Sequence, residues 1–263
     1  MTIGRSSDFS RIADRYDDTR NLPSEILGSA FHQLYGRGVF SNHMRILDAG
    51  CGTGQISIPL VNDGHRITGI DLSEDMLEIA RSKTKDKTNV DYIACDVQSL
   101  PFRDATFDGV VVSKLFQHVG NWRRAVDELT RVTRSRGYIL HIQDRGAFNT
   151  SVRREFSRLA DMAEYKDRYI GTQRLAEVKE YFQSKGIIGR EERLNSVSWE
   201  KHITYQTAFS EIKDRMFAEF WSIPDQKYQI LLDELEKWIS QHPGGMNTCE
   251  TLKCQLVIDS YCV

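Results

Sequence analysis

A glycine-rich turn, RILDAGCGTGQIS at residues 45–57, is the first feature whose residue types and spacing suit chemistry. Gly50, Gly52 and Gly54 alternate with other residues directly after a short apolar run. Glycine lets the backbone adopt positive φ and lets a ligand approach without a Cβ in the way. A helix that begins behind such a turn also offers unpaired N–H groups to the ligand. The turn therefore predicts a site for a nucleotide-like ligand.

An acid follows at the end of the next expected strand. Asp71, in the stretch TGID, stands 21 positions after Gly50. A carboxylate at that place can accept hydrogen bonds from both hydroxyls of a ribose. A nicotinamide-binding turn needs the spacing G-x-G-x-x-G or G-x-G-x-x-A, but here the third small position falls on Gln55. The pattern therefore favours a nucleoside with a small zwitterionic tail over a dinucleotide.

The elements that must position these residues alternate between strand and helix. Expected strands cover RILDA, HRITGID, VDYIACDV, FDGVVVSK and YILHIQD, with helices between most of them. We expect Ser73 to cap one of these helices, and NWRRAVDELTRV to form another with an apolar stripe on one face. Because such alternation is joined by right-handed crossovers, it predicts an α/β fold with a doubly wound, mostly parallel sheet.

Further helices are expected on both sides of this alternation. We expect residues 1–44 to form an N-terminal helical cap and residues 45–263 to form the main domain. REERLNSVSWEKHI is expected to be one strand, and a helical insertion at about 204–242 precedes a last strand near KCQLVIDSYCV. The insertion is rich in bulky apolar residues. These predict either simple packing against the domain or a lid over a hydrophobic substrate cavity.

Composition excludes several classes of function. The chain has 263 residues, a formal net charge of -2 and 40% hydrophobic residues, so no global positive field attracts nucleic acid. No apolar run reaches the roughly 20 residues of a membrane helix, and the first residues lack the apolar core of a signal peptide. The five cysteines are scattered without a C-x-x-C pair. We therefore expect a cytoplasmic protein without nucleic-acid or membrane partners and without a metal, as a monomer or homodimer.

With these motifs in place, the chain resembles the class I S-adenosylmethionine-dependent methyltransferases over roughly residues 8–145. ILDAGCGTGQIS looks like their first motif, and ITGIDLSEDMLEIAR resembles the next. DYIACDVQSLPFRDATFDGVVVS looks like the third and fourth, and AVDELTRVTRSRGYIL is similar to the helix and fifth strand. The resemblance implies a seven-stranded Rossmann-like sheet with S-adenosylmethionine as cofactor and S-adenosylhomocysteine as product.

The resemblance also implies which residues hold the methionine part of the cofactor. The backbone of Gly50, Cys51 and Gly52 would bind this part. Asp48 would support the turn or the cofactor's amino group. The carbonyl of Ser113, at the end of the fourth strand, would accept from the ammonium.

The nucleoside part is assigned in the same way. Asp71 would bind the ribose, and Leu72 and Met76 would lie against the adenine. Asp96 would accept from the adenine amino group, while the Val97 backbone N–H would meet the ring.

Two more residues come from the N-terminal stretch YDDTR, which looks like the segment that closes over the cofactor. Tyr16 and Arg20 would approach the methionine carboxylate, with Arg20 as its counter-charge; the alternative is a helix packed on the sheet edge. One stretch departs from the family. Residues 134–137 are Arg-Ser-Arg-Gly where the family commonly has Lys-Pro-Gly-Gly, which questions the local geometry of that turn.

His118 is the candidate general base, in the stretch SKLFQHVGNW. In this family that loop borders the transferred methyl group, and imidazole titrates near neutrality. The alternative is a histidine that caps or packs the loop. Methyl transfer itself depends mainly on aligning the nucleophile and excluding water.

Absent motifs narrow the substrate. No Pro-Pro-Tyr follows the fourth strand, as in methylases of amino groups, and Asp144 is followed by Arg145 rather than by the Asn of metal-dependent catechol methylases. The arginines at 123–136 are interrupted by acids, so a solvated helix face is favoured over an RNA-binding one. We expect a methyl transfer to O, N or C of a small molecule or short peptide. The alternatives are an RNA or protein methyltransferase, a non-catalytic cofactor-binding regulator and, last, a dehydrogenase.

Overall fold

The computed structural model describes residues 7–166 and 169–263, which fold into two compact units. The first unit comprises the described part of Met1–Gln143 together with Ile170–Val197 and Leu256–Val263. The second comprises Asp144–Tyr169 and Ser198–Gln255. Each unit has its own hydrophobic core.

An eight-stranded sheet runs in the order β3-β2-β1-β4-β5-β8-β6, with β7 paired to β8 outside this path. The strands are β1 (Arg45–Ala49), β2 (Arg66–Asp71), β3 (Val90–Ala94), β4 (Phe107–Ser113), β5 (Thr133–Arg145), β6 (Gly189–Glu191), β7 (Ser198–Thr204) and β8 (Cys249–Cys262). Strands β1 to β5 pair in parallel, whereas β6 and β7 are antiparallel to β8. The chain order reverses at β1 and β4, and ligands of such sheets bind at the carboxyl ends of the strands there.

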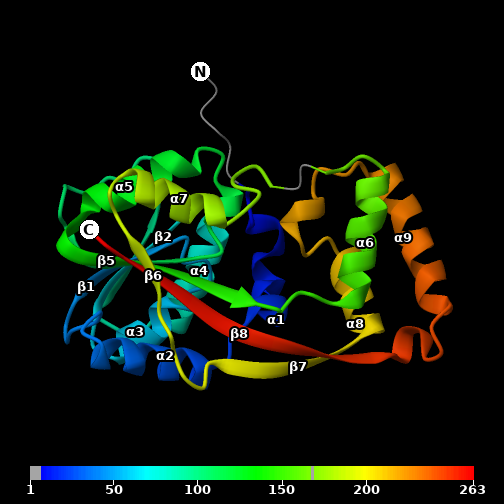
Figure 1. The fold of residues 1–263 in the computed structure, drawn as a ribbon, viewed down its shortest axis with the longest axis horizontal. Helices are drawn as coiled ribbons and strands as arrows, with labels where there is room; N and C mark the ends of the chain where they lie inside the picture. The colour runs from blue at the N-terminus through cyan, green and yellow to red at the C-terminus, as the bar shows by residue number, and fades with distance from the viewer. Residues whose placement is uncertain (1–6, 167–168) are drawn as a thin grey trace. The chain divides into compact units, whose positions relative to one another are not determined.

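Helices of the first unit cover both faces of its sheet. They are η1 (Ser10–Arg15), α1 (Tyr16–Arg20), α2 (Ser24–Gly36), α3 (Ser57–Asn62), α4 (Glu74–Lys83), η2 (Phe116–His118), α5 (Trp122–Val132) and α7 (Ala176–Ser184). Helices α5 and α7 lie on one face, and α2 and α3 on the other (Figure 1). The predicted α/β, doubly wound class is therefore confirmed.

Local sequence explains why two of these helices form where they do. The Ser73 side chain accepts a hydrogen bond from the Met76 N–H, 3.3 Å away, and so caps α4 as expected. Helix α5 buries its whole apolar stripe in the core of the first unit. Burial of such a stripe is the main source of stability for a helix of this length.

The sheet has one strand more than the seven expected, among the described residues. The stretch predicted as a single strand, 190–203, holds β6 and β7 separately, and both pair with the long β8. Ser196 has a φ of 53° and breaks the extended chain between them. Before that break the buried Glu192 binds Arg37, Arg190 and the Ser260 hydroxyl. Alternation of residue types cannot reveal this interruption, because a tertiary ion cluster and a left-handed residue cause it.

The second unit contains α6 (Ser151–Met162), α8 (Tyr205–Lys213), η3 (Ala218–Phe220), α9 (Asp225–Ser240) and η4 (Gly245–Asn247), with β7 and the first part of β8. Bulky residues of its helices, such as Phe156, Phe209, Phe220 and Leu235, are buried in the unit's own core. An exception is Ile230, with 51% of its surface exposed. Most of the apolar surface noted in the sequence thus packs inside this unit.

The turn that departs from the family lies at the start of β5. Arg136 has a φ of 62°, and its N–H donates to the Val263 carbonyl at 2.6 Å. A Cβ at Gly137 would lie 2.8 Å from the Asp108 carbonyl oxygen, so this position accepts only glycine. A left-handed non-glycine residue costs on the order of 1 kcal/mol, as expected for Arg136.

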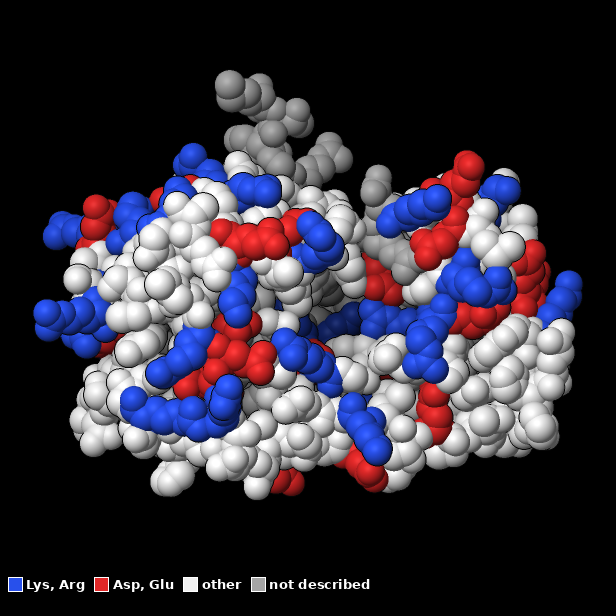
Figure 2. Space-filling view, viewed as in Figure 1, with Lys and Arg blue, Asp and Glu red and all other residues white. Residues whose placement is uncertain are grey.

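Charges and hydropathy of the described residues add two findings. Figure 2 shows Lys and Arg side chains interspersed with Asp and Glu on the face that it draws. Within residues 7–166 and 169–263, no helix combines the length and apolar character needed to cross a bilayer.

Candidate functional site

The glycine turn connects β1 to α3 and bridges the ends of two strands. The N–H groups of Gly50 and Cys51 both donate to the Ile70 carbonyl, at 2.8 and 2.9 Å. Gly50 has a φ of 71°, and a Cβ there would lie 2.8 Å from the Leu115 Cδ1 atom. Only glycine fits without strain, so the backbone of the turn stays open to a ligand.

Asp71 ends β2 beside this turn. Its carboxylate accepts from the Gly52 N–H at 3.0 Å and from the Ser73 N–H at 2.9 Å. Burial raises the pKa of Asp71, while these backbone N–H groups oppose the rise. Two carboxylate oxygens offer about four acceptor positions, so capacity remains for the hydroxyls of a ligand.

A pocket enclosing about 650 Å³, part of it open to solvent, lies at the ends of β1, β2, β3 and β4. It brings together most of the residues that the sequence singled out: Tyr16, Gly50, Gly52, Asp71, Leu72, Met76, Asp96, Val97, Ser113 and His118. They come from five separate stretches of the chain.

Three predicted residues do not line this pocket. Asp48 is buried behind the turn, where the Ser57 hydroxyl donates to its Oδ2 at 2.6 Å. Cys51 is buried too, and only its neighbouring glycines reach the pocket. Arg20 is buried with its guanidinium carbon 5.0 Å from the centre of the Tyr16 ring. From these positions the three residues can support the glycine turn and the Tyr16 ring.

Seven lining residues were not anticipated as part of the site: Ser7, Phe9, Ile70, Cys95, Lys114, Leu115 and Val119. Ile70 and Cys95 adjoin predicted residues at strand ends, so strand register was a usable signal for them. Lys114 directly follows Ser113, a predicted residue at the end of β4, so the same signal applied to it, whereas Phe9 had none. Lys114 has a φ of 52°, and its Nζ donates to the Arg20 carbonyl at 3.3 Å.

The segment η1–α1 is held against the glycine turn by polar contacts. Asp17 accepts from the Thr53 hydroxyl at 2.5 Å and pairs with Lys83. Gln55, which occupies the third small position of a dinucleotide turn, donates to the Arg20 carbonyl at 3.1 Å and to Asn21 at 2.9 Å. Gln55, which departs from the dinucleotide pattern, thus binds the segment that carries Tyr16.

His118 ends η2, after β4, and lines the pocket. Its N–H donates to the Leu115 carbonyl at 2.8 Å, and its carbonyl accepts from the Ser7 N–H at 2.9 Å. The imidazole meets the Phe9 ring edge to face, with centroids 4.8 Å apart. The backbone around His118 is therefore held from two sides.

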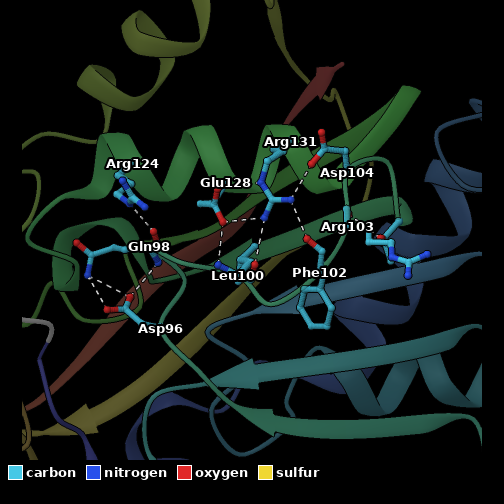
Figure 3. A network of polar contacts seen from close by, with 10 residues as sticks. Asp96, Gln98, Leu100, Phe102, Arg103, Asp104, Arg124, Glu128 and Arg131 are labelled. Atoms are coloured by element: carbon cyan, nitrogen blue, oxygen red, sulfur yellow. Dashed lines mark hydrogen bonds and ion pairs between the residues drawn. The ribbon is translucent and has the colours of Figure 1, made fainter.

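The polar face of α5 is exposed at Arg123, Arg124 and Asp127, as the sequence predicts, and part of it also contacts the loop after β3 (Figure 3). The Arg124 Nε donates to the Gln98 carbonyl at 2.6 Å. Arg131 donates to the Phe102 carbonyl at 2.7 Å, and Glu128 accepts from the Leu100 N–H at 2.8 Å. Arg131 also lowers the pKa of Glu128 by hydrogen bonding. These charges hold the loop that carries Asp96.

We expect Asp48 to make the stability of the cofactor-free protein depend on pH. Burial raises its pKa from 3.8 to about 7, against the opposing hydrogen bond from Ser57. Between about pH 4 and 7 the folded state binds a proton that the unfolded state has lost, so stability falls as pH rises and levels off above 7. This change in the free energy of unfolding amounts to a few kcal/mol, and we expect the Asp48→Asn variant to lose it.

Thermal unfolding at pH 5, 6, 7 and 8 measures this effect, with the exposed Asp91→Asn as control. The melting temperature of Asp48→Asn should decline less with pH than that of the wild type. An equal decline of the melting temperature in Asp48→Asn and in wild type would show that Asp48 is not the titrating group.

Comparison with known proteins agrees with this geometry. Residues 47–141 match the family described as methyltransferase domain. The demethylmenaquinone methyltransferase of Staphylococcus aureus (strain MRSA252) is 32% identical over 143 residues, which are 51% of this chain and 58% of that protein. The enzyme of the same name from Staphylococcus haemolyticus (strain JCSC1435) is 31% identical with the same coverage. The match thus spans 58% of the length of these curated relatives.

Solved structures show the same fold at low identity. The YcgJ protein from Bacillus subtilis superposes with a TM-score of 0.56 and 20% identity, over 88% of this chain and 98% of that one. Phosphoethanolamine N-methyltransferase 2 from Haemonchus contortus, in complex with S-adenosyl-L-methionine, gives a TM-score of 0.52 and 16% identity over 97% and 60%. The fold predicted from the motifs is therefore confirmed, and residues 47–141 match the kind of domain that the resemblance implied. Residues 47–141 of this chain are thus similar to methyltransferase domains.

Proposed function

We propose that this chain transfers a methyl group from S-adenosylmethionine to O, N or C of a small molecule or short peptide. One observation carries the proposal. Asp71 and Asp96, from the ends of neighbouring strands, line the same pocket as the glycine turn and His118. Acceptors for a ribose and a purine amino group thus share one space with a candidate base.

The residues of the pocket fit this cofactor. The turn leaves room at Gly50 that a Cβ would fill, and Asp71 retains acceptor positions for ribose hydroxyls. Leu72, half exposed at 51%, and the buried Met76 supply apolar contacts for a purine ring. The cofactor, when bound, supplies a methyl group on a positively charged sulfur.

The chain's own contribution is positioning and one proton transfer. The pocket aligns the acceptor atom and keeps water away from it, which accounts for much of the rate in such transfers. His118 accepts the proton that the acceptor loses. It is placed for this because η2 follows β4, at the strand end beside the turn.

The relatives support a small acceptor. Their names denote methylation of demethylmenaquinone and of phosphoethanolamine, both small molecules. The α5 arginines Arg124 and Arg131 are engaged with the loop after β3, which weakens their use as an RNA-binding face. All five cysteines are free, which supports a reducing compartment such as the cytoplasm.

Incubation with methyl-labelled S-adenosylmethionine and fractionated host metabolites tests the proposal. Mass spectrometry should find label in a small-molecule fraction, and the Asp71→Ala variant should leave that fraction unlabelled. Label confined to RNA or protein would favour the macromolecular alternative. Cofactor binding without label in any fraction would favour a regulatory protein.

A further inference from the structure

Gln98 joins the Asp96 carboxylate to the start of α5. Its side-chain Nε2 donates to both Asp96 oxygens, at 3.1 and 3.0 Å, and its backbone N–H donates to Oδ1 at 2.8 Å. The Gln98 Oε1 accepts from the Asn121 N–H at 3.1 Å. Gln98 is only 3% exposed, and Figure 3 shows its amide directed at Asp96.

This arrangement limits what Asp96 can do. An ionised carboxylate only accepts hydrogen bonds, and an amide nitrogen that donates to both oxygens restrains its rotation. The Gln98 backbone is held in turn by the Arg124 Nε, 2.6 Å from its carbonyl. Asp96 lines the pocket, so a ligand there meets a carboxylate whose orientation is restrained.

Because the Asp96 carboxylate can only accept hydrogen bonds, it distinguishes between purines by the group at C6. Adenine carries an amino group at C6, which donates to a carboxylate. Hypoxanthine carries an oxo group at C6, which only accepts, so it would face the Asp96 carboxylate acceptor to acceptor and form no hydrogen bond with it. A site built for one hydrogen-bond pattern discriminates strongly against a ligand that lacks it.

We propose that Gln98 is a positioning residue that makes the pocket select a 6-aminopurine over a 6-oxopurine, by holding Asp96 as a fixed acceptor. The inference rests on the proposed use of S-adenosylmethionine. It goes beyond that function because it assigns the selectivity to a residue outside the ligand contacts, acting through Asp96.

Binding of two ligands to three proteins tests this role. The ligands are S-adenosylhomocysteine and its deaminated analogue, S-inosylhomocysteine, measured by calorimetry. Wild type should prefer the adenosyl ligand by about 100-fold or more. Gln98→Met, which keeps the length of the side chain but loses its donors, should reduce that preference about 10-fold.

Gln33→Met is the matched control. The Gln33 side chain also hydrogen-bonds a distant segment, donating to the Asn195 carbonyl at 2.8 Å and accepting from the Asn195 N–H at 2.7 Å, but it does not line the pocket. Gln33→Met should prefer S-adenosylhomocysteine over S-inosylhomocysteine by the same factor as wild type. A merely structural role of Gln98 would weaken both ligands by the same factor and leave the ratio unchanged, which would overturn the inference.

A second variant keeps the test decisive if Gln98→Met does not fold. Gln98→Glu preserves the shape of the side chain but turns a carboxylate toward Asp96. It should therefore weaken the binding of the adenosyl ligand more than that of the inosyl ligand. An unchanged ratio in this variant also contradicts the inference. If wild type binds neither ligand, it is the proposed function that fails.

Discussion

Replacing Asp71 by alanine is expected to weaken the binding of S-adenosylhomocysteine at least about 100-fold. The carboxylate is placed to accept from ribose hydroxyls, and hydrogen bonds to charged groups contribute about 1.5–3 kcal/mol each. The change also removes the acceptor of the Gly52 N–H, 3.0 Å away, and so loosens the turn itself. Calorimetric titration of both proteins measures the effect.

Asp75→Ala is the control for this variant. Asp75 lies in the first turn of α4, close in sequence to Asp71, but does not line the pocket. Its substitution removes one negative charge from the same region and should leave affinity within a few-fold of wild type. Near-normal affinity of Asp71→Ala would exclude the ribose assignment.

Replacing His118 by alanine is expected to lower kcat by about 10²–10⁴-fold, the usual contribution of a general base. Cofactor affinity should stay near that of wild type, because the backbone contacts of His118 with Leu115 and Ser7 do not involve its side chain. Steady-state kinetics at saturating acceptor, with the acceptor found by the labelling experiment, measures the change.

Two further variants separate proton transfer from packing. His118→Gln retains polar atoms but cannot take up a proton, so it should be as slow as His118→Ala. Recovery of the rate in His118→Gln would indicate that the side chain only positions the loop. His32→Ala, on the exposed side of α2, should leave kcat unchanged.

Much of the first unit was predictable because its signals are local. The glycine turn, the Ser73 cap and the apolar stripe of α5 each depend on residues close together in sequence. The ends of parallel strands also meet at one edge of a sheet, so Asp71 and Asp96 were expected near the turn and both line its pocket.

Other features depended on partners far away in the chain. Asp48, expected to support the turn or the cofactor's amino group, lies behind the turn, where the Ser57 hydroxyl donates to its carboxylate. The charges on α5 looked solvated by composition, yet Arg131 and Glu128 bind backbone groups of the loop after β3. Composition of a helix face cannot show whether a loop covers it.

The sequence by itself predicted the resemblance to methyltransferases, the doubly wound fold and the positions of the glycine turn and its acids. These depend on backbone conformation and on periodic burial, which short stretches encode directly. Only the tertiary structure decided that Gln98 holds Asp96, that Gln55 fastens the N-terminal segment, and that β6 and β7 are separate strands. The reason is physical: a polar side chain takes its partner from whichever segment folding brings within hydrogen-bond distance, and no local pattern records that choice.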